Sequence, residues 1–415
     1  MNRFIALATC LAALVAGAAH AESVVIRNAA VHTMTGATLN NADVLMTNGK
    51  VIAVGANLRA PSDATTIDAQ GKIVTPGLFG GLTHLGLDEI GLEPSLDDAQ
   101  VKLGQMRPEF DVTPAFDPDA TAIGVNRLGG VTFAALAPTT ARNHGSSIAG
   151  QGSIVTLDGA VMQRSQALHV DVGADSSELT GGSRAVQYML LNQAFAEART
   201  PSLSLGDEQR LLTPAGRQTL LAYAKNGPIV FNADRASDIR QVLALAAREK
   251  LRVVISGGAE AWRVASELAA AKVAVILDPL DNLPASFDKV GATLENAARL
   301  DRAGVTVAFS FNDHESHNIR RLRQAAGIAV AHGLPWEKGL AALTKNPAQL
   351  FGVADRVGSI APGRNANLVV WSGDPLDVTS VAEHVFIGGK LMPTRSRQTE
   401  LRDRYLERLK KSAAR

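Results

Sequence analysis

Two short stretches concentrate the residues that could do hydrolytic chemistry. The first, PGLFGGLTHLGLDEIG (76 to 91), is a proline-glycine turn followed by a short apolar strand that ends in His84. The second, VTVAFSFNDHESHN (305 to 318), is an apolar strand followed at once by Asp313, His314 and His317. Imidazole and carboxylate groups hold divalent metals such as zinc, and they also transfer protons near neutral pH. These four residues are therefore the first candidates for a reaction centre.

The spacing within each stretch limits the metal site that could form. Side chains two apart on a strand point to the same face, so a His-x-His at a strand end would aim two imidazoles at one metal. Here the pair is Leu82-Thr83-His84, and leucine has no lone pair to donate. His314 and His317 would share a face if a helix begins there. Because the loops after the first and last strands adjoin in a closed barrel, all four candidates could form a replacement site.

Each candidate also has a purely structural interpretation. His84 could line a cavity through a hydrogen bond, Asp313 could cap a helix, and His314 and His317 could be surface loop residues. We expect His84 and Asp313 in a pocket, and we leave open whether one divalent ion, zinc or similar, binds there or none. The remaining histidines are predicted to lie at the sandwich or the barrel periphery without a functional role: His32, His169, His332 and His384.

Alternating strands and helices must position these residues. Continuous apolar runs typical of strands buried on both faces occur at 131–138, 228–233, 252–256, 273–278 and 305–310. The segments 236–250 and 259–272 show helical spacing of apolar residues opposite a charged face. Repeated βα units favour an α/β fold with a TIM-type barrel, and a doubly wound open sheet is the alternative.

The two ends of the chain differ from its middle. Short β runs fill the segment before Pro76, where Asn48-Gly49 is a strong hairpin signal, and β character returns near the C-terminus. We therefore predict a composite β-sandwich built from 22–75 and 360–393, with the barrel, 76–359, inserted between them. Residues 394–415 form a basic amphipathic segment that is predicted to be a helical tail.

The first residues predict export. Asn2 and Arg3 precede an apolar run and small residues before Glu22, as in a signal peptide spanning 1–21. The run is too short for a membrane anchor, so we expect a periplasmic protein with no integral membrane segment after signal removal. A lipoprotein attached at Cys10 is the weaker alternative, because Thr9 is a poor fit before the modified residue.

Composition excludes several functional classes. Cys10 is the only cysteine, so the mature chain has no disulfide, thiolate metal site or cysteine nucleophile. The 41 Lys and Arg balance the 40 Asp and Glu, which gives no sign of a nucleic-acid partner. The expected partner is a small-molecule ligand, and a homo-oligomer is left open.

Two segments and their order resemble the amidohydrolase superfamily, in particular its imidazolonepropionase-like and dihydroorotase-like branches. The segments are IDAQGKIVTPGLFGGLTHLGL and, after the barrel, ALTKNPAQLFGVADRVGSIAPGRNANLVVWSGDPL, and the barrel between them resembles the same group more loosely. The resemblance implies a distorted (β/α)8 barrel flanked by a composite β-sandwich, and a catalytic aspartate near Asp313. The family's His-x-His is reduced here to His84, and its preceding aspartate is Gly80.

The resemblance also implies histidines at the ends of two middle strands. This chain has Asn232, with Asp234 two residues on, and Gly257 at those places. Neither an amide nor a glycine replaces imidazole for zinc, so the metal site is predicted to be degenerate. Asn232, Asp234, and Asp88 and Glu89 in the loop after the first strand are predicted to line the pocket.

Two functions remain from different classes. The first is an exported hydrolase that opens a C–N bond in a cyclic amide or a similar small molecule, with a rearranged or missing metal site. The second is a pseudoenzyme, a non-catalytic binding or assembly module that keeps only the barrel. The β segments at both ends argue against a two-lobed solute-binding protein.

Overall fold

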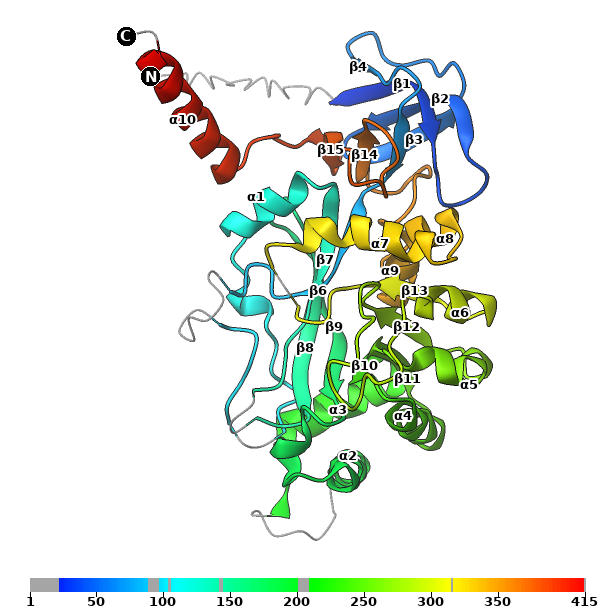
Figure 1. The fold of residues 1–415 in the computed structure, drawn as a ribbon, viewed down its shortest axis with the longest axis vertical. Coiled ribbons are helices and arrows are strands. Elements are labelled where there is room, and N and C mark those ends of the chain that lie inside the picture. Colours follow the sequence, from blue (N-terminus) through cyan, green and yellow to red (C-terminus); the bar gives the residue numbers. More distant parts are fainter. Residues whose placement is uncertain are drawn as a thin grey trace, which may run out of the picture.

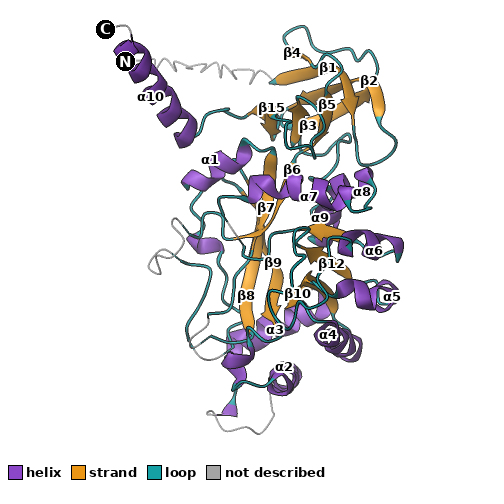
Figure 2. Ribbon diagram, in the orientation of Figure 1, coloured by secondary structure: helices purple, strands orange, loops and turns teal. Residues whose placement is uncertain are grey.

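The fold is described from a computed structural model that covers residues 22–88, 97–103, 106–141, 145–200, 209–314 and 316–413. The predicted signal peptide, 1–21, and Glu89 lie outside the described residues. Two eight-stranded sheets organise the chain (Figures 1 and 2). No helix of the described part is long and apolar enough to cross a membrane.

The first sheet combines both ends of the chain. Its strands follow the order β16-β15-β14-β5-β1-β2-β3, with β4 beside β1. Asn48 and Gly49, both at positive φ, form the predicted hairpin turn between β2 and β3. The strands are β1 (Ser23–Val31), β2 (Leu39–Thr47), β3 (Lys50–Gly55), β4 (Thr65–Asp68), β5 (Ile73–Pro76), β14 (Leu368–Trp371), β15 (Ala382–Ile387) and β16 (Lys390–Leu391).

The second sheet is a nearly closed barrel, which confirms the predicted fold class. Its strand order is β13-β12-β11-β10-β9-β8-β7-β6. The two edge strands are linked by polar contacts, because Leu82 N–H donates to Ser310 Oγ (2.9 Å) and His84 N–H donates to His314 O (3.0 Å). The strands are β6 (Leu78–Thr83), β7 (Val131–Leu136), β8 (Ile148–Thr156), β9 (Val161–Asp171), β10 (Pro228–Ala233), β11 (Arg252–Gly257), β12 (Ala274–Leu277) and β13 (Val307–Phe309).

One strand departs from the βα repeat expected from the sequence. β8 is antiparallel to both β7 and β9, and a turn with Gly159 at φ +94° joins β8 to β9. The polar turn TLDGA supplies the sharp reversal that a hairpin needs. β9 therefore reaches the same end of the barrel as the other parallel strands and delivers Asp171 there.

Helices cover the outside of the barrel. α4, α5 and α6 lie along β10 to β13 in Figure 1. The predicted helix at 259–272 is divided into a 3-10 turn (Ala261–Val264) and a short α-helix. The helices are α1 (Thr121–Arg127), α2 (Arg184–Arg199), α3 (Pro214–Asn226), α4 (Ala236–Glu249), α5 (Ala265–Ala270), α6 (Asn296–Arg302), α7 (Leu322–Ala331), α8 (Trp336–Ala342) and α9 (Lys345–Leu350).

The basic tail forms α10 (Arg397–Ala413), which extends away from both sheets (Figure 1). Its contacts are with α1 near its first turn. Leu401, Tyr405, Leu406 and Leu409 are exposed along it.

Candidate functional site

The carboxyl ends of the parallel strands meet at one end of the barrel, where active sites of this fold are found. β6 ends next to His84, and the chain after β13 continues to Asp313 and His314. β9 carries His169 and Asp171, and β10 carries Asn232 with Asp234 just beyond it. The remaining positions at this end are Gly257 on β11 and Asp278 after β12.

His84 and His314 lie together, as expected from a closed barrel. Their rings stack with centroids 5.4 Å apart and an interplanar angle of 15°. His84 Nε2 is buried and has no hydrogen-bond partner in the described part of the chain. Burial lowers the pKa of His84, and it lowers the pKa of His314 to about 4 with the help of His84. Both imidazoles are therefore neutral near pH 7.

His169 and Asp171 join this pair, so the prediction that His169 lies at the periphery is wrong. His169 is 5% exposed, and burial together with His314 and His84 lowers its pKa to about 3. Asp171 accepts a hydrogen bond from the Thr140 hydroxyl (2.7 Å), and burial raises its pKa. The two residues stand two apart on β9, the same spacing that drew attention to His84. That spacing was the overlooked signal.

Other predicted residues lie apart from this cluster. His317 is exposed, and its Nε2 is 3.0 Å from Asn318 Nδ2. Asp88 lies in the turn after His84, where burial raises its pKa and its Oδ1 lacks a hydrogen-bond partner among the described residues. The predicted ligand set of His84, His314 and His317 is therefore only partly brought together.

A partly buried ion network lies beside β10 and β11. Lys289, in the loop between β12 and α6, places Nζ 2.9 Å from Asp281 Oδ2 and 3.5 Å from Asp234 Oδ2. Asp234 Oδ1 accepts a hydrogen bond from Ala259 N–H (3.1 Å), and Asn312 Nδ2 donates to Asp281 Oδ2 (2.9 Å). Sequence reasoning missed Lys289 and Asp281, because the path of this loop cannot be inferred from strand spacing.

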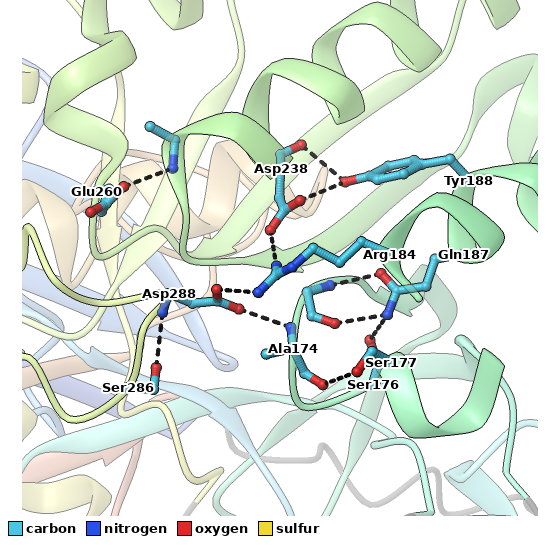
Figure 3. A network of polar contacts seen from close by, with 12 residues as sticks. Ala174, Ser176, Ser177, Arg184, Gln187, Tyr188, Asp238, Glu260, Ser286 and Asp288 are labelled. Atoms are coloured by element: carbon cyan, nitrogen blue, oxygen red, sulfur yellow. Dashed lines mark hydrogen bonds and ion pairs between the residues drawn. The ribbon is translucent and has the colours of Figure 1, made fainter. Parts of the chain in front are cut away.

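A second network fixes the same loop (Figure 3). The Arg184 guanidinium bridges Asp288 in the loop and Asp238 at the start of α4. Asp288 also accepts a hydrogen bond from Ala174 N–H (2.8 Å) in the loop after β9. Gly291 N–H donates to the buried Glu260 carboxylate (2.9 Å). The loop after β12 is thus held over the barrel end by neighbouring loops.

A cavity of about 800 Å³ opens between the loops after β12 and β13, α7 and the segment around Asp377. Of the residues predicted from the sequence, Asp313 lines it, together with Asp278, Asn312 and Arg321. Asp278 accepts from Leu280 N–H (2.9 Å) and Asn312 N–H (3.4 Å), and burial raises its pKa to about 6. The volume is that of a small-molecule pocket, and a carboxyl group with this pKa exchanges protons near neutrality.

Comparisons with known proteins agree with this architecture. The model of the amidohydrolase family matches residues 219–392. A solved amidohydrolase from Thermotoga maritima MSB8 superposes with a TM-score of 0.80 at 28% identity, and covers 90% of this chain and 100% of its own. In residues 219–392 and in its fold, the chain is similar to the amidohydrolase family.

Two curated relatives match this chain over part of their own length. Adenine deaminase 3 from Rhizobium meliloti is 24% identical over 385 residues, which are 89% of this chain and 57% of the relative. Amidohydrolase tasK from Hapsidospora irregularis is 37% identical over 115 residues, 25% of this chain and 12% of the relative. The chain thus spans less than two thirds of the length of these relatives.

The residues present do not fit the metal set expected of an amidohydrolase. Leu82 is buried among apolar side chains and offers no donor. Gly257 has φ +80°, and a Cβ there would lie 2.7 Å from Asp234 Oδ1 and 2.9 Å from Asn232 Oδ1, so an imidazole has no room. Among the described residues, no three His, Cys, Asp or Glu side chains are arranged to hold a metal ion.

Proposed function

We propose that this protein is an exported hydrolase that opens a C–N bond in a cyclic amide or a similar small molecule, without the metal set expected of an amidohydrolase. The observation that carries the proposal is Asp278, a carboxyl group with a pKa of about 6 that lines an 800 Å³ cavity at the barrel end. The similarity to the amidohydrolase family and the names of the relatives support this reaction class.

The chemistry assigned to the cavity is general acid-base hydrolysis. Asp278, ionised above its pKa, accepts a proton from a water molecule as that water attacks the amide carbon. The C–N bond then breaks, and the proton passes from Asp278 to the leaving nitrogen. Asp313, which also lines the cavity, is the second carboxylate that can orient the water or the substrate. Leu280, Ile328 and Val378 contribute apolar surface for the rest of the substrate.

The test is a hydrolysis screen on the protein from residue 22 onward. A panel of five- and six-membered cyclic amides is followed by amine or carboxylate release at pH 7.5, with and without a chelator. We expect turnover that survives the chelator, falls at least 100-fold in Asp278→Asn, and is unchanged in Asp355→Asn, an exposed carboxylate beside Arg356. Turnover that is insensitive to Asp278→Asn would contradict the assignment.

The alternative is a non-catalytic binding or assembly module with an amidohydrolase fold. The specific observation in its favour is that Leu82, Asn232 and Gly257 stand where the resemblance leads one to expect ligands. A module of this kind would bind cyclic amides, measured by calorimetry, without turning any of them over. Binding without turnover across the panel would replace the first proposal by this one.

Export is proposed from the sequence alone. A basic start, an apolar run and small residues before Glu22 support cleavage of 1–21. N-terminal sequencing of protein recovered from the periplasmic fraction should begin at Glu22. Retention of Met1 in a cytoplasmic fraction would contradict this proposal.

A further inference from the structure

Lys289 occupies an unusual place for a lysine. Its side chain is 18% exposed, and the carboxylates that it contacts, Asp234 and Asp281, are 18% and 14% exposed. Ammonium groups are strongly hydrated, so lysine is seldom this buried unless it is paired. The hydrolysis proposed above makes no use of Lys289, and the contacts therefore require another explanation.

The position of Lys289 relative to the missing ligands supplies one. Lys289 contacts Asp234 through Oδ2, and the other oxygen of that carboxylate lies 2.7 Å from the place of a Cβ at Gly257. Asn232 Oδ1 lies 2.9 Å from the same place. The Asp234 carboxylate thus contacts the Lys289 ammonium through one oxygen, while its other oxygen lies beside the end of β11, one of the two strand ends without an expected histidine.

We propose that the Lys289 ammonium is the resident cation of the barrel end, and that it takes over the charge-neutralising role of a bound metal. Asp234 directly follows β10, and Asp281 lies in the loop after β12. The ammonium contacts both carboxylates, and Asn312 from the segment after β13 donates a hydrogen bond to Asp281, so the network joins three barrel elements. Lys289 is a positioning residue in this arrangement.

The charge state is consistent with this role. Burial lowers the pKa of Lys289, but Asp234 and Asp281 outweigh it, and the net shift of this pKa is upward. The ammonium is therefore retained across the neutral range. A fixed cation of this kind removes the need to capture a metal after export.

The inference predicts a gain of function. Replacing Lys289 by methionine keeps most of the apolar stem and removes the charge, which leaves the Asp234 and Asp281 carboxylates facing a space of ammonium size. Oxygen donors of this kind suit Ca²⁺. Lys289→Met should bind one Ca²⁺ per chain with a dissociation constant below about 1 mM, the range of weak protein calcium sites. The wild type should not bind Ca²⁺ at that concentration.

Matched variants identify the site. Lys289→Arg keeps the positive charge and should bind no Ca²⁺. Lys338→Met removes an exposed lysine paired with Asp301 and should also bind none. Adding Asp234→Asn to Lys289→Met should weaken Ca²⁺ binding at least tenfold.

The readout is calorimetric titration with Ca²⁺, together with the unfolding temperature in Ca²⁺ and in chelator. If Lys289→Met does not fold, Lys289→Gln is used, and Ca²⁺ should raise its unfolding temperature while leaving the wild type unchanged. A folded, Ca²⁺-free Lys289→Met and Lys289→Gln would overturn the inference, as would Asp234-dependent Ca²⁺ binding by the wild type. Neither result depends on hydrolysis, so this inference and the proposed function can fail separately.

Discussion

The Arg184 bridge gives the sharpest prediction about what holds the barrel end together. Arg184→Ala leaves two carboxylates without their guanidinium, and these side chains are buried, with Asp238 5% and Asp288 10% exposed. Removing one partner of a buried ion pair costs about 3–5 kcal/mol. Arg184 itself is 28% exposed, and Asp288 keeps its hydrogen bond from Ala174, so the expected cost is near the lower limit, about 3 kcal/mol.

Urea unfolding at pH 8, followed by circular dichroism, measures this cost. The control is Arg240→Ala, which breaks an exposed pair with Glu267 (51% and 42% exposed) and should cost less than about 1 kcal/mol. Repeating both at pH 5 adds a second constraint. Burial already raises the pKa of Asp238 and Arg184 opposes it, so without Arg184 this carboxyl takes up a proton more readily and the penalty should shrink. Equal costs for the two variants, or a penalty independent of pH, would refute the importance of the bridge.

Three further predictions concern the barrel end. Burial raises the pKa of Asp278 from 3.8 to about 6 in the folded protein, so Asp278 takes up a proton on folding between these pH values, and the stability of the wild type falls as pH rises through them. Asp278→Asn should therefore be more stable than the wild type by about 2–3 kcal/mol at pH 7 and equally stable below pH 4. Urea unfolding at both pH values measures the difference. Burial lowers the pKa of His169 to about 3, so the wild type should lose stability as pH falls below 6.5. His169→Gln should lose less stability over the same pH range. Equal losses of stability in the two proteins would contradict this prediction. Gly257→Ala should cost about 2 kcal/mol more stability than Gly304→Ala in thermal unfolding. Both glycines have positive φ, but only at Gly257 would the new Cβ lie within 3 Å of side-chain oxygens, those of Asp234 and Asn232. Equal costs would show that these two side chains can move aside.

Much of the fold could be predicted because local signals agree with the global arrangement. Asn48-Gly49 can adopt the positive φ of a hairpin turn, and the continuous apolar runs correspond to β7, β10, β11, β12 and β13. Short runs that are apolar throughout are typical of strands buried on both faces of a sheet, so these runs were predicted as strands. The antiparallel direction of β8 could not be predicted, because the direction of a strand does not alter the pattern of apolar residues in its sequence.

The site was harder to predict because its residues are brought together by loops. His84, Asp313 and the absent donors at Leu82 and Gly257 follow from strand spacing alone. His169 and Asp171 share that spacing, but the sequence does not show that β9 runs parallel to β10 and ends at the same end of the barrel. Lys289 and Asp281 belong to the loop after β12, whose path depends on ion pairs with Asp234 and with Arg184 through Asp288.

The measurement that tests the central claim most directly is elemental analysis of the protein from residue 22 onward, purified without chelator. We expect far less than one zinc, manganese, iron or calcium per chain in the wild type, because Lys289 is the cation of the barrel end and the expected ligand positions have no donors or no room. Near-stoichiometric metal that is lost in His84→Ala would contradict it, since the histidine cluster would then hold an ion.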